Sequence, residues 1–182
     1  MNFPIRKSTR LENYDYSQSG AYFITVCSDK HRCMFSRISV GALHEAPEFQ
    51  LTEYGKIVKE VLDTVAVRFE NVSISDYVIM PNHLHLILYL NSCGRALREA
   101  PLPYKPRSEL SKVIGFLKMN ATKRIHEISP HEVVWQRGYY DHIIRDESDY
   151  AVRAKYICDN PFKWRDDEYF SVGDTNEIYH HG

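Results

Sequence analysis

The feature that most constrains how this chain folds is a pair of apolar segments separated by only two residues. Val72–Met80 alternates at first and then becomes continuously apolar, and His83–Leu90 is strongly apolar apart from its two histidines. Only Pro81 and Asn82 lie between them. Proline and asparagine favour tight turns, so we expect the two segments to pair as an antiparallel hairpin.

Helices and further strands surround this hairpin in an alternating order. Strands are predicted where short runs are apolar, β-branched or aromatic, which is the case for Ala21–Cys27, Met34–Ile38, Val133–Trp135 and Tyr139–Ile144. Helices are predicted where apolar residues recur at helical spacing, which is the case for Glu53–Phe69, Ser108–Glu127 and Ser148–Asn160. Thr52 and Ser148 are the expected N-caps of the first and third helices. This order favours an α+β fold of ferredoxin-like kind, with helices packed on an antiparallel sheet.

Length and composition exclude several classes of protein. The 182 residues are 43% hydrophobic and 26% charged, which is ordinary for one globular domain and excludes a fully disordered or collagen-like chain. No apolar run approaches the roughly 20 residues that span a membrane, and no apolar stretch follows the charged N-terminus. The four cysteines lack metal-binding spacing and are expected to be free thiols. We therefore expect a cytoplasmic protein without a membrane partner.

Charge is unevenly distributed along a chain whose net charge is only −1. Residues 105–124 carry six Lys or Arg residues and one acid, whereas residues 166–182 carry five acids and no Lys or Arg. A basic surface is typical of nucleic-acid-binding proteins, and a solvated helix face is the simpler interpretation. We predict one domain over residues 1–165, followed by an acidic tail over residues 166–182.

His83 and His85 give the predicted hairpin its most suggestive chemistry. Side chains alternate between the two faces of a strand, so both imidazoles point to one face and Leu84 points to the other. Two imidazoles so placed can bind one divalent metal ion. A His-x-His pair in a strand is often incidental, but burying two histidines without partners in this apolar strand costs free energy. That cost favours a metal-binding role.

Tyr156 and Asn160 form a second suggestive pair. They are four residues apart on the third predicted helix and therefore share one of its faces. A phenol and an amide on one face can supply a nucleophile and a metal ligand side by side. The alternative is a tyrosine that packs in the core, which is the more common role in a chain with 13 tyrosines.

Three segments together resemble one protein family. They are Tyr77–Leu86 (YVIMPNHLHL), Trp135–Arg145 (WQRGYYDHIIR) and Tyr156–Pro161 (YICDNP). In this order they resemble the IS200-like single-tyrosine transposases (the Y1, or HUH, type), and among these the REP-associated tyrosine transposases. The similarity extends over about residues 21–164, and each segment alone would be unspecific.

The resemblance implies a fold, an activity and a set of site residues. The family fold is ferredoxin-like, and its members cleave and rejoin single-stranded DNA, usually beside a hairpin. The family's His-hydrophobic-His motif falls on His83 and His85, its nucleophilic tyrosine on Tyr156 and its third metal ligand on Asn160. These ligands imply Mg²⁺ or Mn²⁺, which accept amide oxygens. Some relatives act as homodimers and others as monomers, so both states stay open.

Further residues are predicted to assist this chemistry or to hold DNA. His142 and Asp141 are candidate helpers of the tyrosine, and a purely structural role for His142 is the alternative. Candidates for contacts to phosphates or for stacking on unpaired bases are Lys112, Lys118, Lys123, Arg124, Arg137, Tyr139 and Tyr140. Core packing is the alternative role of the two tyrosines.

Two other functions fit parts of the sequence. One is a non-catalytic DNA- or RNA-hairpin-binding module descended from the same family. The other is a ferredoxin-like regulator that binds metal without DNA. The enzyme is favoured because all four residues of the predicted site are present, namely His83, His85, Tyr156 and Asn160.

Overall fold

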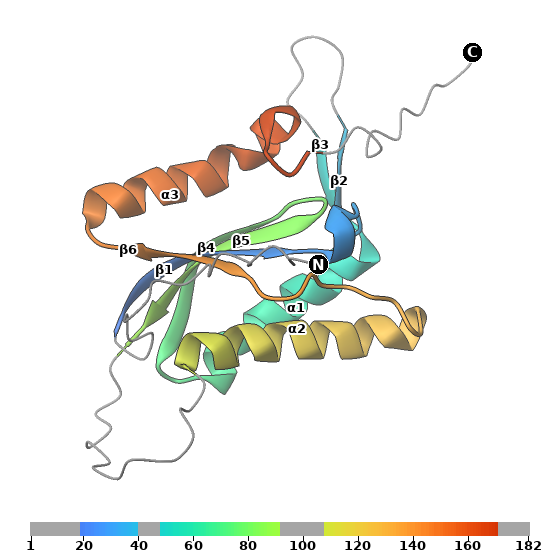
Figure 1. Ribbon diagram of the computed structural model, residues 1–182, viewed down its shortest axis with the longest axis horizontal. Coiled ribbons are helices and arrows are strands. Elements are labelled where there is room, and N and C mark those ends of the chain that lie inside the picture. The colour runs from blue at the N-terminus through green and yellow to red at the C-terminus, as the bar shows by residue number, and fades with distance from the viewer. Residues whose placement is uncertain (1–18, 40–47, 92–107, 171–182) are drawn as a thin grey trace, which may run out of the picture.

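The computed structural model describes residues 19–39, 48–91 and 108–170, and its centre is a four-stranded antiparallel sheet (Figure 1). In the order β4-β5-β1-β6, its strands are β4 (Val72–Ile79), β5 (His83–Leu90), β1 (Gly20–Cys27) and β6 (Tyr140–Ile144). β4 and β5 pair as neighbours in an antiparallel hairpin. The hairpin predicted from Pro81 and Asn82 is therefore confirmed.

Two helices connect these strands in the ferredoxin-like way. In the chain, α1 (Glu53–Arg68) lies between β1 and β4, and α2 (Glu109–Ile128) lies between β5 and β6. Each connection therefore skips one strand of the sheet, which gives the βαββαβ arrangement and confirms the predicted fold class. The side chains of Thr52 and Ser108 accept backbone hydrogen bonds at the starts of the two helices, as N-caps do.

The larger core lies on the face of the sheet that α1 and α2 cover (Figure 1). Alternate residues of the two central strands point to this face, among them Tyr22, Ile24, Leu84 and Leu86, all at most 1% exposed. Burying one large apolar side chain contributes about 1.5–3 kcal/mol. This face therefore supplies most of the hydrophobic stabilisation of the fold.

The opposite face is covered by α3 (Glu147–Asp159) and the 3₁₀ helix η2 (Asn160–Asp166) (Figure 1). The apolar cluster here is smaller and includes Phe23, Ile87 and Trp164. Of the 13 residues of α3, only Ile157 is buried. We call this side of the sheet the α3 face.

A second, two-stranded sheet borders the α3 face. It consists of β2 (Ser36–Ser39) and β3 (Glu48–Leu51), which lie between β1 and α1 in the chain. Ile38 packs against the smaller apolar cluster, so the hairpin flanks α3 and η2. Sequence reasoning placed β2 slightly early and did not predict β3.

Other boundaries also differ from the predictions. Asp146, not Ser148, caps α3, because Asp146 has the extended backbone of an N-cap and accepts the Asp149 N–H at 2.9 Å. Pro161 does not end the helical path, because proline is tolerated in the first turn of the following η2. The predicted strand Val133–Trp135 is reduced to one isolated bridge.

Some predicted features lie outside the described residues, among them Cys93 and the predicted acidic tail after Phe170. Cys27, Cys33 and Cys158 are free thiols, as expected. Within the described ranges, none of the helices has the length and apolar character that a membrane crossing requires.

Candidate active site

His83 and His85 lie side by side on the α3 face and are almost completely buried. Their ring centroids are 4.4 Å apart, and their exposed fractions are 0% and 1%. Leu84 between them points into the larger core on the other face, as strand alternation predicts. The sheet itself therefore fixes the two imidazoles next to each other.

Each imidazole is held by a hydrogen bond at Nδ1. His83 Nδ1 lies 2.9 Å from Asn82 Oδ1, and His85 Nδ1 lies 2.9 Å from Thr25 Oγ1. The Asn82 amide nitrogen donates to two backbone carbonyls, so its oxygen is the atom that faces His83. His83 therefore donates from Nδ1, which leaves the lone pair on Nε2.

The two Nε2 atoms are buried and have no hydrogen-bond partner among the described residues. Burial lowers the pKa of both imidazoles, that of His85 to about 3, so both rings are neutral at pH 7. A neutral imidazole whose Nδ1 is already hydrogen-bonded is the form that coordinates metal ions. Without a ligand, each unpartnered nitrogen costs free energy.

α3 and η2 bring the side chains of Tyr156 and Asn160 to the two histidines. The Tyr156 ring meets the His85 ring edge to face with centroids 5.2 Å apart, and Tyr156 is 38% exposed. Asn160 Oδ1 is another buried atom without a partner in the described part of the chain. Burial and the charge of Asp167 raise the pKa of Tyr156, and a hydrogen bond from Asn160 lowers it. The net shift is upward, so the phenol is protonated at pH 7.

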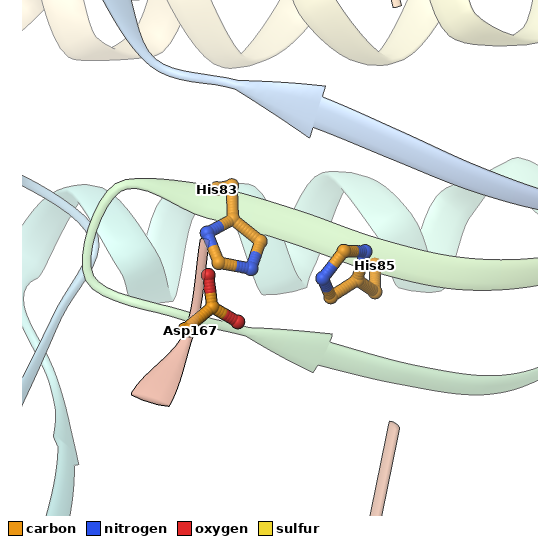
Figure 2. A group of neighbouring side chains, drawn as sticks. All are labelled: His83, His85 and Asp167. Carbon is orange, nitrogen blue, oxygen red and sulfur yellow. The ribbon is translucent and has the colours of Figure 1, made fainter. Parts of the chain in front are cut away.

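Asp167 completes this cluster, and sequence reasoning missed it. The ligand atoms of His83, His85 and Asp167 lie within 4.8 Å of one another (Figure 2). Tyr169, from the same segment, packs its ring against His83 with centroids 4.8 Å apart. The first residues of the predicted acidic tail thus fold back onto the sheet, and no spacing in the sequence reveals this return.

The available donor atoms fit a divalent metal ion. Two imidazole nitrogens and a carboxylate form a group that can bind one, and an unpartnered amide oxygen belongs to the same site. Oxygen donors suit Mg²⁺ and Mn²⁺, and the orphaned Nε2 atoms supply the nitrogen positions.

Comparison with known proteins finds similar chains in Haemophilus influenzae, and no family model matches. One protein without an assigned function is 35% identical over 173 residues, which cover 91% of this chain and 93% of that protein. Another, described as a REP-associated tyrosine transposase, is 28% identical over 159 residues, which cover 84% and 77%. The solved structure of a REP-associated tyrosine transposase bound to a REP hairpin has the same fold, with a TM-score of 0.57 at 20% identity over 85% and 74% of the two chains.

The chain is thus similar in sequence to a REP-associated tyrosine transposase and shares the fold of another. The resemblance carried by the three sequence segments is therefore confirmed. In this chain, the segments that contain His83, His85, Tyr156 and Asn160 meet on the α3 face.

The structure separates the two predicted helper residues of Tyr156. His142 lies on the α3 face, where its Nε2 is 2.7 Å from an Asp149 carboxylate oxygen. Asp141 is paired with Ile24 in the sheet and lies on the opposite face, away from Tyr156. His142 therefore ties β6 to the first turn of α3, and Asp141 is not brought to the site.

The basic residues of α2 lie on the far side of the sheet from Tyr156. Lys118 donates hydrogen bonds to the backbone carbonyls of Gln136 and Gly138 at 2.6 and 2.8 Å. It therefore stabilises the loop before β6. Lys112 and Arg124 form ion pairs with acids of α2 and α1, and Lys123 is exposed. These four residues therefore lie on the helix behind the sheet and are not brought to the site.

The remaining predicted DNA contacts are divided between the faces. Tyr140 is 45% exposed and pairs with Thr25, so it lies on the α3 face. Tyr139 packs against the larger core on the opposite side. Arg137 is exposed in the loop before β6. Of the two tyrosines, only Tyr140 lies on the same face of the sheet as Tyr156.

Proposed function

We propose that this protein is a transposase, namely a metal-dependent nuclease and strand transferase that acts on single-stranded DNA beside hairpins. The observation that carries the proposal is the meeting of two unpartnered imidazole nitrogens with an accessible phenol, those of His83, His85 and Tyr156. Sequence similarity to a REP-associated tyrosine transposase supports the enzyme class. The REP hairpin bound by the structurally similar transposase supports a hairpin substrate.

Tyr156 is the proposed nucleophile. Its phenol oxygen attacks the scissile phosphorus, the bond from phosphorus to the 3′ oxygen breaks, and that oxygen takes up a proton to become a free 3′-OH. The other DNA end stays attached to the protein as a 5′-phosphotyrosine. Attack by a 3′-OH on this phosphotyrosine rejoins the strand, so the reaction needs no ATP.

His83, His85 and Asn160 are the proposed ligands of a Mg²⁺ or Mn²⁺ ion. Such an ion supplies positive charge that neutralises the non-bridging oxygens of the scissile phosphate. The protein holds both rings in place beforehand, because Asn82 and Thr25 bond to the two Nδ1 atoms and both Nε2 atoms are left without a partner among the described residues.

DNA is proposed to lie across the α3 face. Tyr140 would stack on an unpaired base, and the exposed Arg137 would contact a phosphate. His142 is proposed to position α3 through Asp149 rather than to exchange protons with Tyr156. Because Tyr169 packs on His83, we propose that the catalytic domain extends beyond residue 165, at least to Phe170.

The direct test is covalent capture of DNA. The protein is incubated with Mn²⁺ and single-stranded hairpin oligonucleotides drawn from repeats that flank its gene, and the products are separated on a denaturing gel. We expect a metal-dependent protein–DNA band that Tyr156→Phe abolishes. Tyr150→Phe is the matched control, because Tyr150 lies on the same helix but its hydroxyl bonds to Asp76.

Two outcomes would contradict the proposal. If Tyr156→Phe still forms the covalent band, another residue is the nucleophile. If the protein binds the hairpins but cleaves none of them with either metal, the non-catalytic binding module becomes the better account.

A further inference from the structure

We propose that Asp167 supplies a carboxylate ligand to the metal ion, in addition to His83 and His85. The inference rests on the proposed metal-dependent function and adds a ligand from the segment after η2, which the sequence resemblance does not include. Its ligand atom lies within 4.8 Å of those of both histidines, and Figure 2 shows the carboxylate beside the two rings. Both histidine Nε2 atoms are buried and lack partners in the described ranges.

Local hydrogen bonds hold Asp167 in this place. Its backbone N–H donates to the carbonyl of Trp164 at 3.2 Å, which continues the turn of η2. Its side-chain Oδ1 accepts the backbone N–H of Tyr169 at 2.8 Å. The side chains of Asn160 and Tyr156 also hydrogen-bond to this carboxylate, so it is held among the residues of the proposed site.

The segment that carries Asp167 is also anchored to the histidines. The backbone carbonyl of Tyr169 accepts a hydrogen bond at 2.7 Å from the same Asn82 amide that orients His83. The Tyr169 ring packs on His83 and stacks on His31, with centroids 4.8 and 5.3 Å apart. These contacts make the carboxylate part of the site rather than a chance neighbour.

The test measures binding of Mn²⁺ alone to the purified protein by titration calorimetry. Asp167→Asn removes the carboxylate charge with little change of shape, and we expect the dissociation constant to rise at least about tenfold, since even outer partners of metal ligands are worth that much. Glu168→Gln is the matched control, because this exposed neighbour loses the same charge and is expected to change affinity by less than about twofold. His85→Leu is expected to abolish binding.

A second readout does not depend on affinity. In the parent protein, saturating Mn²⁺ is expected to slow amide hydrogen exchange in residues 167–170 as well as in β5, and in Asp167→Asn only β5 is expected to respond. Thermal unfolding of each variant confirms that it is folded.

The outcomes separate this inference from the proposed function. If Asp167→Asn binds Mn²⁺ as tightly as the parent while His85→Leu does not, Asp167 is no ligand and the histidine site stands. If Asp167→Asn and Glu168→Gln weaken binding equally, the effect is general charge and the inference is overturned. If the parent binds no Mn²⁺ at millimolar concentration, both the inference and the metal dependence fail.

Discussion

The two faces of the central sheet are built from the same strands but carry different kinds of side chain. On the face covered by α1 and α2, β5 contributes Leu84 and Leu86 to a continuous apolar core. On the α3 face, the same strand contributes His83 and His85, whose Nε2 atoms are buried without partners in the described structure. Neighbouring residues of β5 therefore differ. Leu84 and Leu86 are packed in an apolar core, whereas His83 and His85 each keep a buried nitrogen without a hydrogen bond.

The difference shows where the fold gains stability and where it places chemistry. α1 and α2 each bury six residues, whereas α3 buries one. A buried polar atom without a partner costs about 1–3 kcal/mol, and the α3 face carries several. We infer that the packed face stabilises the fold well enough to hold the other face ready for ligands.

The largest expected contrast comes from adjacent residues of β5. Leu86→Ala leaves a cavity in the packed core and is expected to lower the free energy of unfolding by about 2–5 kcal/mol. His85→Leu removes a proposed metal ligand and is expected to lower the single-turnover rate of DNA cleavage at least about a hundredfold, with an unfolding free energy within about 1 kcal/mol of the parent. Urea titrations and cleavage assays on both variants check this. Equal loss of stability in the two variants would remove the distinction between the faces.

The residues that orient the imidazoles give a smaller effect. Asn82→Leu removes the oxygen that holds His83 Nδ1 and is expected to weaken Mn²⁺ binding about 10- to 100-fold. Asn82→Asp keeps an oxygen in that position and is expected to retain more affinity than the leucine variant. Calorimetric titration with Mn²⁺ measures both. Unchanged affinity in Asn82→Leu would show that the neighbouring strand alone positions the ring.

Stability of the metal-free protein is expected to fall as the pH is lowered from 7.5 to 5.5. The pKa of both imidazoles is lowered in the folded protein, whereas in the unfolded chain it is about 6.5, so only the unfolded chain takes up protons in this range. Each imidazole then removes about 1.4 kcal/mol of unfolding free energy. Urea unfolding at both pH values tests this, and His85→Leu is expected to lose part of the dependence. An identical pH dependence in the two proteins would contradict the assignment.

The smallest expected effect concerns DNA affinity. Arg165 lies on η2 at the α3 face, whereas Lys123 lies on α2 behind the sheet, and both are exposed. If DNA occupies the α3 face, Arg165→Gln is expected to reduce the slope of log K for hairpin binding against log salt concentration by about one. Lys123→Gln changes affinity by less than about twofold. Binding measured over a range of salt concentrations compares them, and the reverse result would restore the basic helix as the DNA contact.

Much of the fold could be predicted because local signals and tertiary packing agree. The hairpin at Pro81 and the helix after Thr52 lie where turn chemistry, capping and apolar spacing all coincide. β3 was missed because a four-residue strand carries little pattern of its own. Ser148 was predicted as the cap of α3 and Asp146 is the observed one, because both residue types cap helices and only the backbone distinguishes them.

From the residues alone, the site could be predicted only where its side chains lie on the same strand or helix. His83 and His85 share a strand, so the alternation of side chains along that strand is enough to place them together. Asp167 and Thr25 reach the site through tertiary folding, from a segment after η2 and from β1. Asn82 was assigned only to the turn, although it immediately precedes His83. The basic helix was assigned to DNA from charge alone, and charge does not say which face of a sheet a helix covers.

The central claim is that Tyr156 forms a covalent bond with DNA on the α3 face. It is tested most directly by trapping the product of a hairpin oligonucleotide with Mn²⁺, digesting it with nuclease and trypsin, and sequencing the modified peptide by mass spectrometry. The account predicts a nucleotide remnant on the peptide Tyr156–Lys163, which contains one tyrosine. Strand cleavage with the remnant on any other residue, or with no protein-bound remnant at all, would contradict it.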